Sequence, residues 1–81
     1  MKRGHDGLVT FLATELELGF TFVQLARTEM GLDPNASERA RQNATAALAA
    51  VKHLESRIDV EERRAIQARA LELEVAIRDL T

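Results

Sequence analysis

The stretch Gly31-Leu32-Asp33-Pro34-Asn35 is the clearer of two interruptions in the helical pattern of this chain. Gly31 can close one helix, because glycine tolerates the backbone conformations that follow a helix end. Asp33 can cap the next helix, and Pro34 suits its first position. The stretch therefore predicts two helices joined by a tight turn.

A second, subtler break follows at Asp59-Val60-Glu61-Glu62. Asp59 and Glu62 have the spacing of a capping box, in which the N-cap side chain and the residue three positions later satisfy each other's backbone amides. Such a box would be wasted inside a longer helix, so we expect a short turn at 57–59. Alternatively, residues 36–80 form one bent helix.

These breaks predict an all-α fold, a three-helix up-down-up antiparallel bundle, since the segments have similar lengths and short connections. The expected helices span about 7–31, 34–57 and 60–80. Residues 1–6 are expected to form a flexible N-terminal tail before a single helical-bundle domain at 7–81.

Heptad spacing predicts which helix faces meet. The second segment has a seam that begins with small residues, and its members are Ala36, Ala40, Ala44, Ala47, Val51, Leu54 and Ile58. The third segment repeats the spacing with Glu62, Ile66, Ala70, Leu73, Ile77 and Leu80. These repeats favour nearly antiparallel, left-handed packing.

The first segment is apolar around well over half of its circumference and holds all three phenylalanines, Phe11, Phe20 and Phe22. A helix with so wide an apolar face is expected to contact two neighbouring helices, or three. It is therefore the predicted centre of the packing.

The third segment also carries apolar residues roughly opposite its seam, namely Leu71, Val75, Ala68 and Val60. A three-helix monomer has nothing obvious to cover them. We therefore expect these residues to form an interface with a second copy, a dimer being favoured, or with a partner helix. Scattered exposed apolar residues are the alternative interpretation.

Glu15 lies near the middle of the first segment's apolar arc, level with Arg69 if the helices run antiparallel through both turns. The pair is expected to be a structural polar contact that fixes register. A buried carboxylate usable as acid or base is the alternative. Asn43 lies beside the alanine seam, where a buried amide can specify helix register, unless it is solvated at the edge.

Candidate catalytic and metal-binding groups are few. His53 is expected on a solvated face and His5 in the tail, and the chain has no cysteine. Glu-x-x-His, His-Glu-x-x-His and phosphate-loop patterns are absent. We therefore expect no enzyme activity, no cofactor and no metal.

The charge pattern argues against nucleic acid and membrane partners. The net charge is −2, and basic and acidic residues are interleaved. The apolar stretch 8–32 carries four charged residues, which makes a membrane span costly: Glu15, Glu17, Arg27 and Glu29. No signal-peptide pattern appears, so a cytoplasmic location is expected.

Part of the chain resembles a tetratricopeptide repeat: Leu18-Gly19, Phe22, Ala26 and the turn 32–35. The size and layout are also similar to microtubule-interacting-and-transport domains. The spacing departs from the repeat, because the first helix runs through the place where a repeat would turn. The resemblance implies a bundle that binds a peptide or a helix.

The sequence thus predicts a small protein-interaction or assembly module that self-associates. The alternative is a carrier for a small apolar ligand, with a cavity between the phenylalanine-rich first helix and the alanine-rich second helix.

Overall fold

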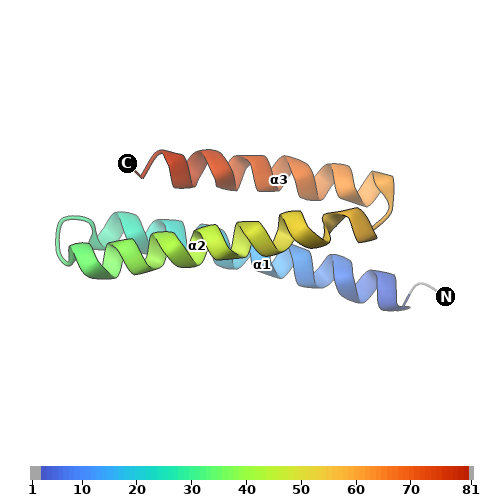
Figure 1. Cartoon of the computed structure of the whole chain (residues 1–81), viewed down its shortest axis with the longest axis horizontal. Helices are drawn as coiled ribbons and strands as arrows, with labels where there is room; N and C mark the ends of the chain where they lie inside the picture. The colour runs from blue at the N-terminus through green and yellow to red at the C-terminus, as the bar shows by residue number, and fades with distance from the viewer. Residues whose placement is uncertain (1–2, 81) are drawn as a thin grey trace.

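The computed structural model describes the backbone of residues 3–80 and the side chains of residues 7–80. This part of the chain contains α1 (Arg3–Glu29), α2 (Pro34–Leu54), a short 3-10 turn η1 (Glu55–Arg57) and α3 (Val60–Arg78). The three α-helices lie along a rod of 49 × 19 × 15 Å, and they run up, down and up (Figure 1). The predicted all-α three-helix bundle is confirmed.

The first helix begins and ends earlier than the sequence suggested. It starts at Arg3 and takes in residues 3–6 of the expected tail, because a long helix anchored by later packing tolerates early glycines. Residues 1–2 lie outside the described part. Gly31 does not adopt a left-handed conformation. The helix is instead closed by the amides of Leu32 and Asp33, which both donate to the carbonyl of Glu29, at 3.0 and 2.7 Å.

The turn between α1 and α2 has the predicted cap. The carboxylate Oδ1 of Asp33 accepts hydrogen bonds from the amides of Asn35 (3.1 Å) and Ala36 (3.2 Å). One turn later, the Ser37 hydroxyl donates to the carbonyl of Ala26 on α1 at 2.8 Å. This cross-helix bond places Ser37 level with Ala26 and so sets the register of α1 against α2.

The predicted break before α3 exists, but the expected cap by the Asp59 side chain does not form. Asp59 occupies the N-cap with an extended backbone, and its side chain makes no capping hydrogen bond. Arg63 holds the turn instead. Its guanidinium donates to the carbonyls of Glu55 (3.2 Å), Ser56 (3.2 Å) and Ile58 (2.9 Å). A side chain on α3 thus donates to carbonyls of η1 and to that of Ile58 in the turn before α3.

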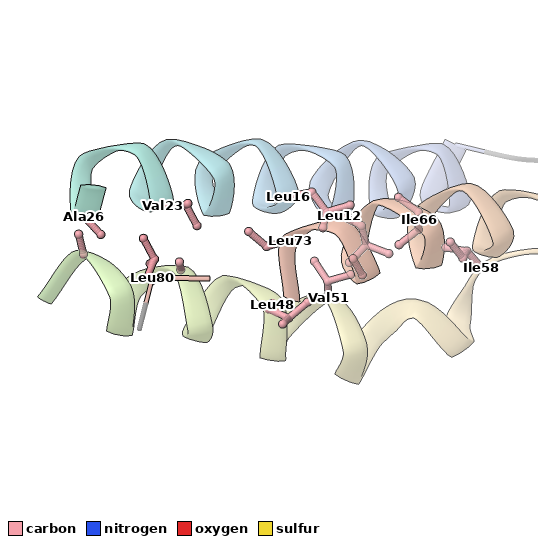
Figure 2. Packing of buried hydrophobic residues seen from close by; sticks show 13 residues of the cluster. Leu12, Leu16, Val23, Ala26, Leu48, Val51, Ile58, Ile66, Leu73 and Leu80 are labelled. Carbon is pink, nitrogen blue, oxygen red and sulfur yellow. The ribbon is translucent and has the colours of Figure 1, made fainter. Parts of the chain in front are cut away.

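The predicted seams of α2 and α3 form most of the core. Their buried members are Ala40, Ala44, Ala47, Val51, Ile58, Ile66, Ala70, Leu73 and Leu80. From α1, the fully buried side chains form a narrow stripe, Leu12, Leu16, Val23 and Ala26, and Figure 2 shows them facing the other two helices. Four further α1 side chains are partly buried against this core: Leu8, Val9, Phe20 and Phe22. Gly19 lies within this stripe and is buried as well.

The phenylalanine-rich helix is therefore not buried as widely as predicted. Phe11 is 44% exposed, and Phe20 and Phe22 are only half-buried. The physical reason is that α1 has two neighbours, α2 and α3, which together cover one side of it. The other side of its apolar circumference faces outward.

Candidate functional site

The most prominent surface feature is a set of large apolar side chains that the bundle leaves exposed. Within residues 7–80 they are Phe11, Leu18, Leu25, Met30, Leu32, Val60, Leu71 and Val75. Their exposed fractions run from 43% for Leu18 and Val75 to 78% for Leu32. They belong mainly to α1 and α3, and on α3 the sequence predicted such uncovered apolar residues.

The exposed side of α1 is a second heptad seam. Each of its residues precedes by one position a buried residue or, for Leu8, the half-buried Val9. They are Leu8, Phe11, Glu15, Leu18, Phe22 and Leu25, of which Leu8 and Phe22 are half-buried against the core. One residue corresponds to about 100° around a helix, so this seam lies beside the buried stripe rather than opposite it. We call it the outer face of α1.

The packing of α3 shows in which direction this outer face points. A groove between α1 and α3 is lined by Ala13, Leu16 and Glu17 on one side, and by Ala65, Ile66 and Arg69 on the other. Two α1 residues in this groove, Ala13 and Glu17, lie off the core stripe. Each of them follows a core residue by one position. The outer face of α1, one position before the core stripe, therefore lies on the side turned away from α3.

The outer face of α3 contains the four residues that the sequence proposed as an interface. Val60 and Leu71 are each 59% exposed, Val75 is 43% exposed, and Ala68 is exposed. The core seam of α3 lies on the opposite side of this helix. The outer faces of α1 and α3 consequently lie on opposite sides of the molecule. The sequence predicted the exposed apolar face of α3, but it predicted α1 to be the central helix of the packing.

The expected contact between Glu15 and Arg69 does not form. Arg69 lies 4.3 Å from the ring centroid of Phe20 and pairs with Glu72. No hydrogen bond or ion pair joins it to Glu15 in the described chain; Glu15 lies half-buried on the outer face of α1. The register was correct to within one turn, because Arg69 shares its groove with Leu16 and Glu17. The error is one of helical phase.

Asn43 and His53 are both exposed, so Asn43 is not a buried amide that fixes register. Among the described residues, no group of three or more histidine, cysteine or carboxylate side chains could hold a metal ion. The side chain of His5 lies outside the described part.

A shallow groove of about 350 Å³ separates α2 from α3. Leu48 and Ile77 form its apolar floor, and its charged rim includes Lys52, Glu74 and Arg78. The Lys52 ammonium lies 3.1 Å from the Glu74 carboxylate, which also pairs with Arg78 at 3.1 Å. Lys52 first, and then Arg78, lower the pKa of the Glu74 carboxyl below its ordinary value. The groove is thus a salt-bridged seam that ties α2 to α3.

The carrier hypothesis needs a cavity between α1 and the alanines of α2. These two helices make the most extensive contact in the bundle, and Ala40 and Ala44 are almost fully buried in it. Three surface grooves within residues 7–80 lie elsewhere: between α1 and α3, between α2 and α3, and beside the α1–α2 turn. The hypothesis stays a prediction without a described site.

By length and composition alone, residues 7–29 of α1 are apolar enough to cross a membrane. Core helices of soluble proteins and N-terminal signal sequences also meet this criterion. In this bundle, one stripe of the same helix supplies part of the core.

The chain matches no protein-family model, no curated protein and no solved structure.

Proposed function

We propose that this protein is a self-associating assembly module, whose outer faces on α1 and α3 are covered by other copies of the chain. The observation that supports this proposal most directly is the number of large apolar side chains left exposed on a chain of only 81 residues. A small bundle gains stability by burying such surface against a partner.

The arrangement of these side chains also supports the proposal. Leu18 and Leu25 follow each other at heptad spacing on α1, and Leu71 and Val75 are one turn apart on α3. Helix–helix contacts between proteins use ordered rows of this kind, whereas single scattered apolar residues need no explanation.

The charges of α1 disfavour an anionic membrane surface as the occupant. Between residues 7 and 26 the helix carries Glu15 and Glu17 and neither lysine nor arginine. Interfacial helices that bind such membranes place lysine and arginine on their polar side.

Sedimentation equilibrium of the full chain over a wide concentration range tests the proposal. We expect a mass above that of one chain at micromolar concentration. The variant with Leu71→Lys and Val75→Lys should associate more weakly while keeping its helical circular dichroism, because both side chains are solvent-exposed.

A matched variant controls for the two added charges. Ala49→Lys with His53→Lys places them on exposed positions of α2, roughly opposite its core seam. This variant should assemble like the wild type. A wild-type chain that stays monomeric throughout would overturn the proposal, as would equal weakening by both variants. Co-flotation of the wild type with vesicles of anionic lipid would point to a membrane occupant instead.

A further inference from the structure

The two outer faces contain matching patterns of charged and apolar residues. On α1, Glu15, Leu18, Phe22, Leu25 and Glu29 follow one another in steps of three, four, three and four residues. We call these five residues the α1 stripe. On α3, read from its C-terminal end, Arg78, Val75, Leu71, Ala68 and Arg64 follow one another in the same steps. We call these five the α3 stripe.

We propose that the α1 stripe of one copy packs antiparallel against the α3 stripe of the next copy. This inference rests on the proposed self-association and names the faces that carry it. In this register Leu18, Phe22 and Leu25 lie opposite Val75, Leu71 and Ala68 of the neighbouring copy. Glu15 then lies opposite Arg78, and Glu29 opposite Arg64.

The lengths of the two stripes agree because both are helical over their full extent. The α1 stripe ends with the last residue of α1, and the α3 stripe ends with the last residue of α3. Each spans two heptads, or about 21 Å at a rise of about 1.5 Å per residue. Three apolar layers between two ion pairs make a continuous helix–helix seam.

Charge selects this pairing over two symmetric alternatives. If two α1 stripes paired antiparallel, centred on Phe22, Glu15 of one copy would face Glu29 of the other at both ends. If two α3 stripes paired about Leu71, Arg64 would face Arg78 at both ends. Like charges facing each other disfavour both arrangements, while the mixed pairing places a carboxylate opposite a guanidinium at each end.

The side chains are available for these contacts. Glu15 and Glu29 are half-buried and Arg64 is exposed; none of the three has an ion-pair partner within the described residues. Arg78 pairs with Glu74 through Nη2, yet 68% of its side chain is exposed. It can therefore also reach a carboxylate of a neighbouring copy.

The helix α2, which lies beside the α1 stripe, leaves room there for a helix of the neighbouring copy. On α2, residues that follow the core seam by one position, such as Thr45 and Lys52, line the groove against α3. Residues that precede it, such as Ala46 and Ala50, therefore lie on the side away from α3, as the α1 stripe does. Ala46 is exposed, and both side chains are small. Continuing the register past Glu29 also brings Leu32 level with the Val60 region of the neighbour.

The geometry makes the assembly open rather than a closed dimer. The two stripes lie on opposite sides of each copy, so a copy bound through its α1 stripe still presents its α3 stripe. Contacts between different faces continue from copy to copy unless the rotation closes a ring. Antiparallel packing makes successive copies point in opposite directions along the row.

Mixing two blocked variants tests the pairing. Leu18→Lys with Leu25→Lys blocks the α1 stripe, and Leu71→Lys with Val75→Lys blocks the α3 stripe. Each variant should be monomeric alone, because it lacks one of the two faces. An equimolar mixture should form a species of two chains and no larger one, since only one functional stripe of each kind is available.

Charge reversal tests the register. Glu15→Arg alone should weaken association by about tenfold or more, because it places two cations opposite each other. Adding Arg78→Glu to the same chain should restore most of that loss. The matched variant that combines Glu15→Arg with Arg64→Glu should not be restored, because Arg64 lies at the other end of the stripe.

The outcomes separate this inference from the proposed function. A monomeric wild type overturns both. A wild type that assembles while the variant blocked in α3 assembles equally well also overturns both, because the proposed function covers the α3 face too. A wild type that assembles while the mixture of the blocked variants stays monomeric overturns the inference alone. Restoration by Arg64→Glu and not by Arg78→Glu would overturn the antiparallel register. Helical circular dichroism of every variant confirms that it folds.

Discussion

Gly19 of α1 lies directly against Leu73 of α3. A Cβ atom at position 19 would come within 2.5 Å of Cδ2 of Leu73, whose side chain is fully buried. Leu73 thus fills the space that a side chain on α1 would occupy. Glycine allows this close approach, because a Cβ atom here would force the buried Leu73 side chain to shift; the backbone of Gly19 itself is ordinary helix.

We expect Gly19→Ala to destabilise the chain by about 1–2 kcal/mol, as overpacking outweighs the higher helix propensity of alanine. Urea unfolding, at a concentration where the chain is monomeric, measures this. Gly7→Ala is the matched control, because no atom lies within 4 Å of a Cβ there, and it should stabilise the protein slightly. Equal effects of the two substitutions would contradict the close contact.

We expect the protein to lose stability when the capping carboxylate of Asp33 is removed. Asp33→Ala leaves the amides of Asn35 and Ala36 without their acceptor and should cost about 1 kcal/mol. Asp33→Asn retains an acceptor oxygen and should remain close to the wild type. Thermal unfolding of both variants checks this, and a neutral Asp33→Ala would show that the cap contributes nothing.

We expect the second turn to lose stability when the Arg63 guanidinium is removed. Arg63→Met removes three donors from the carbonyls of Glu55, Ser56 and Ile58 and should cost about 1–3 kcal/mol. Arg63→Lys keeps the charge without the planar fork and should recover only part of this loss. Hydrogen exchange should show faster opening at the start of α3. Full recovery by lysine would mean that charge alone, not the fork, holds the turn.

Because Glu74 forms salt bridges with Lys52 and Arg78, we expect part of the free energy of unfolding to depend on acidic pH. Lys52 and Arg78 lower the pKa of the Glu74 carboxyl in the folded chain below its ordinary value of 4.5. The stabilisation is therefore complete above pH 4.5 and is lost as the pH falls through the lowered folded-state value.

Lys52→Met should remove the larger part of this effect. The unfolding curves of the wild type and the variant should then converge on acidification. Arg39→Met, an exposed cation on α2 that does not contact Glu74, controls for the change in net charge. A constant difference between the wild type and Lys52→Met from neutral to acidic pH would contradict the role of the Lys52 pair.

Local sequence patterns were sufficient to predict the fold. Asp33 and Pro34 marked the first turn, Asp59 marked the second, and the heptad seams of α2 and α3 identified most of the core. These features are encoded over a few neighbouring residues, so they can be read without knowledge of what packs where.

Both main errors concern which sides of α1 the other two helices cover. The Glu15–Arg69 contact was placed at about the right level but on the wrong side of α1, because one residue of phase turns a helix by about 100°. The burial of the phenylalanines was overestimated for a related reason. A wide apolar arc shows how much surface needs covering, but it does not show how many neighbours the chain supplies.

The sequence by itself determined three helices, their two turns and their core seams, because hydrophobic period and capping chemistry act within each helix. Only the tertiary structure decided that α3 packs beside α1 at Gly19, that Arg63 holds the second turn, and which flank of α1 faces solvent. Those outcomes depend on the relative rotation of helices that are distant in sequence, and this rotation is set by how their side chains interlock.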